Sequence, residues 1–498
     1  MEPTARSLFR LSTLPVLSLF LLSGCATYTK QTQERDTAFR TGNLAAAAAQ
    51  ADADGRKKHQ GKDGILHRLE QGAILRAAAL APGAAPDVSR DYLARSNAAL
   101  DAAEARVNEF EEKAKVKVAS ETASMLTNLA NLPYRGRAYD KVMLSTYKAL
   151  NHLQLGDTDT ARVELNRALQ RQRDAVAENA RHIAEAEEDA RNAATAGADD
   201  AKGGKATYDV GKATADPTTA ASLENILAGS TTAAAARPYA DYVNPFAVLL
   251  DGLYFATHAA DDSDRERAIK SLERVAGMAP ENPFVRDELA GAAAGRRPAG
   301  VTHVIVENGI GPWREETRVD LPLFIVTDKI SYIGAAFPSL KFHDNALLSE
   351  ITITAAGAAA PVAPALVCDM DAVVARDFKN EWPAVVTKTI LSTAIKGTIN
   401  AVAQKQAKDK LGASGGLAVG ILGGVAQGLT TIADTRAWRT LPKQFSYARL
   451  DTPADRALVI NAGGQPHNLQ LPEGDVIIVY IKSIAAGTPL LVSQFKLK

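Results

Sequence analysis

The 498-residue sequence has very little cysteine, few aromatic residues and no excess of charge of either sign. With only 2 cysteines it cannot be a small fold held together by disulfide bonds. The 57 Lys and Arg residues balance 57 Asp and Glu residues, which excludes a nucleic-acid-binding protein that relies on bulk positive charge. The length allows roughly two to four domains, whose stability must come from packing.

Motifs for metal binding or catalysis are also missing. The eight histidines have no metal-ligand spacing, and no H-E-x-x-H motif occurs. Residues 412–416 match the G-x-S-x-G pattern, but a helical pattern precedes them where hydrolases need a strand, so we do not expect Ser414 to be a nucleophile. Asp369, Asp371 and Asp377 are more simply interpreted as a solvated strand face than as a shared site. We expect no catalytic residues, no cofactor and no metal.

The N-terminus has the organisation of a secretory signal peptide. Arg6 and Arg10 precede an uncharged run over 11–22, which is too short for a comfortable membrane span. The sequence Leu-Ser-Gly-Cys25 then resembles the lipobox of bacterial lipoproteins. The alternative is an ordinary signal peptide in which Cys25 is incidental.

The lipobox resemblance implies that residues 1–24 are removed and that Cys25 is acylated, which would hold the protein in a bilayer. Ala26 stands where such families carry Asp for inner-membrane retention, so the implied location is the periplasmic face of the outer membrane. Residues 25–38 would form the lipid anchor and tether. Cys368 would be the only other thiol, and the apolar run before it predicts a buried structural residue in a strand.

Residues 39–192 and 241–298 have apolar residues recurring at three and four positions, which predicts amphipathic helices. Two blocks share the same spacing of small and apolar residues around a turn. In the first block these positions are Ala149, Gly156, Ala161, Leu165 and Ala168. In the second they are Ala256, Ala268, Leu272, Val275 and the helix-ending Pro280. Both blocks resemble tetratricopeptide (TPR) repeats, which stack into a solenoid; the alternative is a generic helical bundle.

The composition changes twice after the first helical block. Residues 193–240 have few large apolar side chains and predict a flexible low-complexity insertion. Residues 299–498 predict a β-rich domain with a helical insertion over 382–433. The expected strands are 301–306, 317–326, 347–353, 365–374, 444–450, 456–461, 467–471, 475–484 and 489–496. The run 475–481 suits a strand covered on both faces.

A glycine recurs every fourth residue within the uncharged stretch 411–433, at Gly412, Gly416, Gly420, Gly424 and Gly428. On one helix these residues form a groove, and each interior glycine weakens a helix by about 1 kcal/mol relative to Ala. Packing in the groove must offset that cost. Three interpretations stay open: contact with a membrane, self-association through the groove, or packing within the domain itself.

Segments 306–309, 315–322, 336–338 and 434–442 resemble those of an uncharacterised family of TPR-containing bacterial lipoproteins. The resemblance implies an α+β architecture, in which an N-terminal TPR-like solenoid precedes the β-rich domain, and an outer-membrane location. It brings no catalytic residues. Within it we expect Trp438 to anchor a turn in the core, with a binding role as the alternative.

The leading hypothesis is a lipid-anchored periplasmic scaffold that binds an envelope protein on the concave face of the solenoid. The alternative is a self-assembling envelope component that forms a homo-oligomer or contacts lipid through 412–428. An enzyme is the third interpretation. No nucleic acid is expected as a partner.

Overall fold

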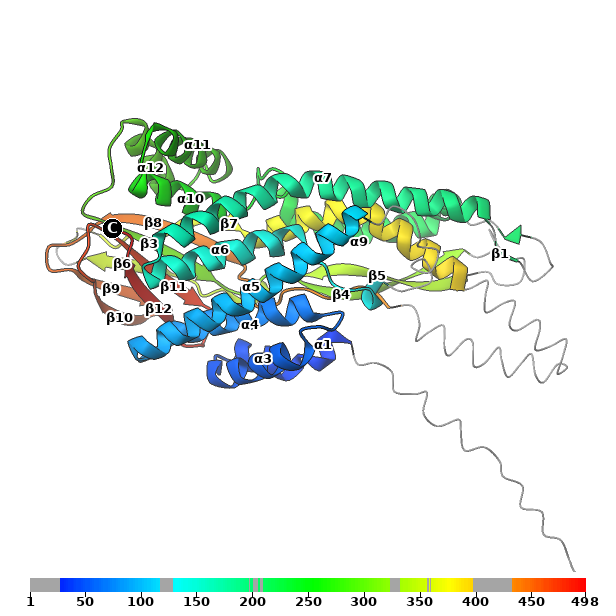
Figure 1. Cartoon of the computed structure of the whole chain (residues 1–498), viewed down its shortest axis with the longest axis horizontal. Coiled ribbons are helices and arrows are strands. Elements are labelled where there is room, and N and C mark those ends of the chain that lie inside the picture. Colours follow the sequence, from blue (N-terminus) through cyan, green and yellow to red (C-terminus); the bar gives the residue numbers. More distant parts are fainter. Residues whose placement is uncertain are drawn as a thin grey trace, which may run out of the picture.

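The computed structural model describes residues 27–116, 129–196, 198–199, 205–206, 209–322, 332–355, 358, 360–396 and 432–498 (Figure 1). The protein is mixed α+β, as predicted. Cys25, Ser414 and the glycines at 412–428 lie outside the described residues. Within the described residues, no helix is both long enough and apolar enough to span a bilayer.

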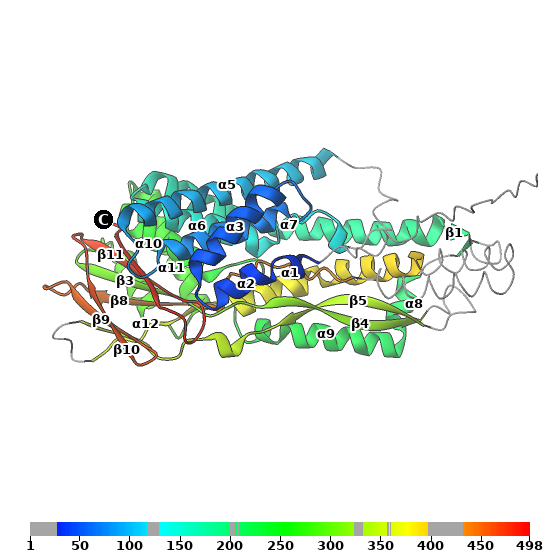
Figure 2. The same ribbon diagram turned by 90° about the horizontal axis from the view of Figure 1, so that it is seen from below.

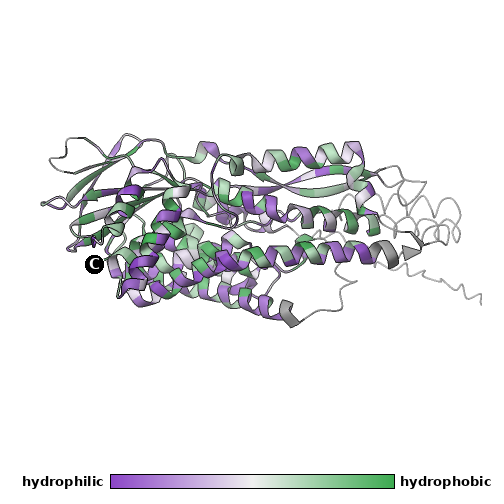
Figure 3. Cartoon of the chain, turned by 90° about the horizontal axis from the view of Figure 1, so that it is seen from above, coloured by the Kyte–Doolittle hydropathy of each residue, from purple (hydrophilic) through white to green (hydrophobic). Residues whose placement is uncertain are grey.

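Most helices form one layer in which each contacts the next along the chain. Hydrophobic and hydrophilic residues alternate along them (Figure 3). The layer consists of α1 (Tyr28–Gln31), α2 (Gln33–Arg40), α3 (Leu44–Lys58), α4 (Gly64–Ala79), α5 (Pro86–Val116), α6 (Ala138–Leu155), α7 (Thr158–Ala196), α10 (Pro245–His258), α11 (Asp262–Met278) and α12 (Pro283–Ala293). A short 3-10 turn, Leu129–Asn131, precedes α6.

Local sequence signals set the turns between these helices. Gly156 ends α6 in the left-handed conformation with a φ of 83°, which glycine adopts without steric cost. The side chains of Asn244, Asp261 and Asn282 cap the N-termini of α10, α11 and α12. Where α10 crosses α11, Gly252 leaves room for the Leu272 side chain.

Ten described strands form two sheets and a ribbon in the C-terminal half. The five-stranded sheet has the order β12 (Leu491–Lys496), β11 (Val476–Ser483), β3 (Val301–Asn308), β8 (Gln444–Asp451) and β7 (Ala365–Asp369), with only β11 and β3 parallel. The three-stranded sheet is antiparallel, with the order β10 (Gln465–Gln470), β9 (Ala457–Ala462) and β6 (Ile351–Ala355). The long ribbon pairs β4 (Trp313–Pro322) with β5 (Tyr332–Lys341). Two short strands, β1 (Ala198–Asp199) and β2 (Lys205–Ala206), pair separately.

The five-stranded sheet is covered on both faces. Alternate residues of β11, such as Ile478 and Tyr480, join the core shared with the helices. The intervening residues, such as Val479 and Ile481, pack with β9 of the three-stranded sheet. Every residue of β11 is buried, which confirms the prediction of a doubly covered strand.

The protein's own sheet packs against the helices that would line the inner face of a solenoid. Helices α4, α6 and α10 are buried along most of their length. Phe246 of α10 stacks on Phe445 of β8 with ring centroids 3.9 Å apart, and the Tyr147 hydroxyl donates to Glu307 of β3 at 2.7 Å. The surface on which the leading hypothesis places a partner is therefore packed against the sheet, and the hypothesis itself stays a prediction.

A second core lies at the other end of the elongated molecule (Figure 1). It brings together the β4–β5 ribbon, α8 (Val210–Ala215), α9 (Pro217–Ala235) and a helix over 370–396. The prediction of a flexible insertion over 193–240 is wrong for 210–235. Asp216 and Pro217 begin α9, and the helix buries Leu223 and Ile226 against the ribbon.

The predicted strand 365–374 and helix start at 382 are also corrected. Strand β7 ends at Asp369, whose side chain accepts a hydrogen bond from the Ala372 backbone N–H and starts the helix at 370. Asp371 and Asp377 are consequently buried helical residues and do not belong to a solvated strand face. Cys368 is buried, as predicted, and burial raises the pKa of its thiol.

The predicted tether over 25–38 is wrong from residue 28 onwards. Helices α1 and α2 begin there and pack on α4, with Tyr28, Arg35 and Asp36 buried. The Arg35 guanidinium donates to the Tyr28 hydroxyl at 3.2 Å and pairs with Asp36 at 2.7 Å. This segment is part of the folded body, since the side chains of Tyr28, Arg35 and Asp36 are buried and bonded to one another.

Candidate functional site

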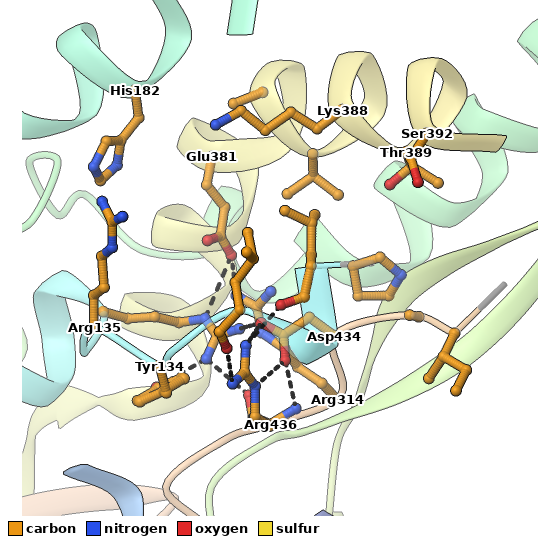
Figure 4. A pocket seen from close by; sticks show the side chains of 18 of the residues that line it. Tyr134, Arg135, His182, Arg314, Glu381, Lys388, Thr389, Ser392, Asp434 and Arg436 are labelled. Atoms are coloured by element: carbon orange, nitrogen blue, oxygen red, sulfur yellow. Dashed lines mark hydrogen bonds and ion pairs between the residues drawn. The ribbon is translucent and has the colours of Figure 1, made fainter. Parts of the chain in front are cut away.

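A cleft of about 310 Å³ lies between the helical layer and the β4–β5 ribbon, and Figure 4 shows the residues that line it. Its walls are the loop over 129–137, the C-terminal half of α7, the helix over 370–396, the β4–β5 ribbon and the segment 432–436. Asn179 of α7 donates to the Asn380 carbonyl at 3.0 Å and holds the two helices together beside the cleft. The cleft therefore depends on five chain segments that lie far apart in the sequence.

The floor of the cleft is a network of paired charges. Arg436 binds Asp434 through two nitrogens, at 2.7 and 3.0 Å. Arg314 pairs with Glu381, and Arg137 lies 3.7 Å from both Glu381 and Asp434. The side chains of Arg314, Glu381, Asp434 and Arg436 point towards one another (Figure 4). Such bidentate pairing fixes the carboxylates in position.

The arginines also set the ionisation of the carboxylates. Burial alone would raise the pKa of Asp434, but the adjacent Arg436 and Arg137 hold it below its usual value. One layer deeper, burial and the neighbouring Glu381 raise the pKa of Asp377 well above its usual value. Asp434 and Glu381 are therefore paired with guanidinium groups, and burial favours the protonated form of the deeper Asp377.

The walls above this floor are apolar and the rim is charged. Leu132, Pro133, Ala336, Pro338, Ala384, Val385 and Leu391 contribute apolar surface. At the rim, Arg135 extends towards His182 of α7, and Lys388, Thr389 and Ser392 come from the helix over 370–396 (Figure 4). Burial lowers the pKa of His182, so its neutral form is favoured. This combination suits a ligand that has both an apolar group and charged or polar groups.

The segment 434–442 connects the cleft to the N-terminal helices. Arg436 pairs with Asp63 at 3.0 Å, and Arg439 lies 3.3 Å from Asp36. The Thr440 hydroxyl and the Arg439 backbone N–H both donate to Glu70 at 2.7 Å. The segment is thus held by the acidic side chains Asp36 of α2, Glu70 of α4 and Asp63 of the turn before α4.

Trp438 has the structural role that we predicted from the sequence. It is 2% exposed and its ring contacts Tyr147 edge-on, with centroids 5.8 Å apart. Its indole N–H donates to the Thr440 hydroxyl at 2.9 Å. A side chain buried in this way anchors the segment in the core.

The structure places the predicted repeat residues in helix contacts, away from the cleft. Ala149, Ala161, Leu165, Ala168, Ala268 and Leu272 are buried, Ala256 is partly buried, Gly156 forms the turn and Pro280 follows α11. Of the cleft residues, the sequence analysis included Asp434 and Arg436 as part of a turn and Ala336 and Pro338 as part of a segment that resembles the lipoprotein family, but it predicted no site there. Within the described residues, no group of three His, Cys, Asp or Glu side chains could hold a metal ion.

Comparison with known proteins gives no relative. No family model, no curated protein and no solved structure matches the chain. The resemblance to TPR-containing lipoproteins therefore stays a prediction, and function must be argued from the cleft and the surfaces around it.

Proposed function

We propose that the protein is a non-enzymatic scaffold or adaptor, anchored by lipid on Cys25 at the periplasmic face of the bacterial outer membrane, that binds an envelope protein. Its helical layer would be a TPR-like solenoid. The support for this repeat assignment is that α6–α7 and α10–α11 are helical hairpins with the same residue spacing, and that successive helices of the layer are in contact.

The observation that carries the proposal is the mixed lining of the cleft. Apolar walls with a charged rim match the pockets in which a protruding side chain of a protein partner is buried. Because the sheet fills the inner face of the helical layer, the cleft replaces that face as the proposed partner site.

The floor supports binding better than catalysis. Glu381 and Asp434 are held by arginines, and this lowers the pKa of Asp434, so a proton on this carboxylate is disfavoured. The cleft is lined by the hydroxyl groups of Thr389 and Ser392, which lie on the helix over 370–396, and by the imidazole of His182, which lies on another helix, α7. The arrangement can position a ligand through fixed charges and apolar contact.

Photo-crosslinking in intact cells tests this function. A benzophenone side chain at Val385, in the cleft, should capture one defined envelope protein, whereas the same group at the exposed Val176 of α7 should not. Lys388→Glu should abolish the capture by reversing a rim charge. Lys379→Glu is the matched control because Lys379 is exposed on the same helix and does not line the cleft.

Equal capture from both positions, or capture that Lys388→Glu leaves unchanged, would contradict a partner site in the cleft. Crosslinks only to other copies of the chain would instead favour the alternative of self-assembly. The glycine-repeat segment 412–428 on which that alternative depends lies outside the described residues, and the alternative stays a prediction.

A further inference from the structure

The proposed lipid anchor lies very close to the folded body. Only two residues separate Cys25 from Tyr28, the first residue of α1. Consecutive Cα atoms are about 3.8 Å apart, so the Cα atoms of Cys25 and Tyr28 can be separated by roughly 11 Å at most. An acyl chain on Cys25 would therefore hold α1 next to the bilayer surface.

Helix α1 cannot serve as a flexible extension of the anchor, because its side chains are fixed to other elements. The Tyr28 ring lies 5.2 Å from that of His67 on α4, and its hydroxyl accepts from Arg35 on α2. The Thr29 hydroxyl accepts a hydrogen bond from Arg439 at 2.7 Å. Bringing α1 to the membrane therefore brings the adjacent surface with it.

That adjacent surface is formed by helices α1, α2 and α3, and we call it the α1–α3 face. The three helices lie together on the side of the molecule seen in Figure 2. On these three helices the exposed charged side chains are four basic residues and one acidic residue: Lys30, Arg40, Arg56 and Lys57 against Glu34. The whole chain, in contrast, has a formal net charge of +0.

We propose that the α1–α3 face lies on the lipid bilayer and contacts its phosphate-bearing headgroups. This inference rests on the proposed lipid anchor and adds the orientation of the protein. Two independent observations carry it: the length of chain between Cys25 and α1, and the excess of basic side chains on the same face, which complements the negative charge of phospholipid phosphates. Helices α7 and α11 lie on the opposite side and would face away from the membrane (Figure 1).

Fluorescence quenching on the full lipidated protein tests the orientation. Cysteines introduced at Thr37 and Lys57 report on the α1–α3 face, and cysteines at Val176 of α7 and Lys270 of α11 are matched controls; all four positions are exposed. Cys368 is buried and will not take the label. The labelled proteins are reconstituted into vesicles of phosphatidylethanolamine with a minority of phosphatidylglycerol that carry headgroup spin labels.

We expect several-fold stronger quenching at residues 37 and 57 than at residues 176 and 270. Equal quenching at all four positions, or stronger quenching at the controls, would overturn the inference. Mass spectrometry of the mature N-terminus separates this outcome from failure of the anchor itself. Acylated Cys25 with uniform quenching refutes only the orientation, whereas an unmodified Cys25 refutes the lipid anchor and the orientation that depends on it.

Discussion

Replacing Arg436 by Met tests whether the charges beneath the cleft hold the two halves of the fold together. The Arg436 side chain is 5% exposed and pairs with Asp434 at 2.7 Å and with Asp63 at 3.0 Å. It also donates to the backbone carbonyls of Leu129 and Leu132, at 2.9 and 2.7 Å. One side chain therefore satisfies two carboxylates and two carbonyl groups from three separate segments.

The magnitude follows from what the substitution leaves behind. Breaking a buried ion pair by removing one partner costs about 3–5 kcal/mol, since the remaining charge stays buried. Each buried carbonyl that loses its donor costs about 1–3 kcal/mol more. Because Arg137 still lies near Asp434, the lower ends of these ranges apply. We expect the free energy of unfolding to fall by roughly 4–6 kcal/mol.

Urea unfolding of the mature chain, followed by tryptophan fluorescence, measures this loss. Arg173→Met on α7 is the control, because Arg173 is exposed and its removal should change the free energy by less than about 0.5 kcal/mol. Combining Arg436→Met with Asp434→Asn should cost less than the sum of the two single changes, because the orphaned charge is removed. A loss below about 1 kcal/mol for Arg436→Met, the size of an exposed ion pair, would refute the reasoning.

Two further predictions concern packing and pH. A Cβ at Gly252 would lie 2.9 Å from Leu272, so Gly252→Ala should lower the free energy of unfolding by about 1–3 kcal/mol, whereas Gly277→Ala, with no atom within 4 Å, should raise it by about 0.5–1 kcal/mol. Thermal unfolding distinguishes them, and shifts of the same sign would contradict the close helix crossing. Burial raises the pKa of Glu70 from 4.5 to about 7. The stability contributed by its protonated form is fully present below about pH 4.5 and is lost as the pH rises through about 7. Glu70→Gln should therefore reduce the change of the urea midpoint with pH between these two values. An unchanged pH dependence would count against this role of Glu70.

Local periodicity was sufficient to predict the helical hairpins and most strands. In α6 and α7 the small and apolar residues follow the helical repeat, and Gly156 supplies the left-handed turn between them. In β11 an unbroken apolar run indicates burial on both faces. These features depend on residues that are near one another in the sequence, so the sequence displays them directly.

Other elements depend on contacts that periodicity does not reveal. Helix α9 is rich in Ala and Thr, and the few large residues that it buries, including Leu223 and Ile226, pack against a ribbon more than eighty positions later. The start of the helix over 370–396 was predicted too late in the sequence, because the apolar residues after Asp369 fit a strand equally well. Only the cap at Asp369 distinguishes the helix from the strand.

The cleft itself could not be predicted in this way. Arg137 and Arg436 are 299 positions apart, yet the Arg137 guanidinium donates to the Arg436 carbonyl at 2.7 Å. In the sequence each arginine resembles an ordinary surface charge, and an exposed salt bridge would contribute little. The only available signal was the segment 434–442, where two arginines flank a tryptophan within a few residues.

The buried polar contacts between the helices and the sheet explain why the inner face of the helical layer is closed. Tyr147 and Tyr480 donate to Glu307, which also pairs with Lys482. Asn282 donates to the Ala365 carbonyl of β7 at 2.9 Å. Apolar packing alone would permit the layer to slide on the sheet, whereas each of these bonds is satisfied in one arrangement only and is costly to leave unmade. A partner of this protein would therefore have to recognise surfaces that folding leaves outside, and among the described residues the charged cleft is a surface that combines apolar walls with fixed charge.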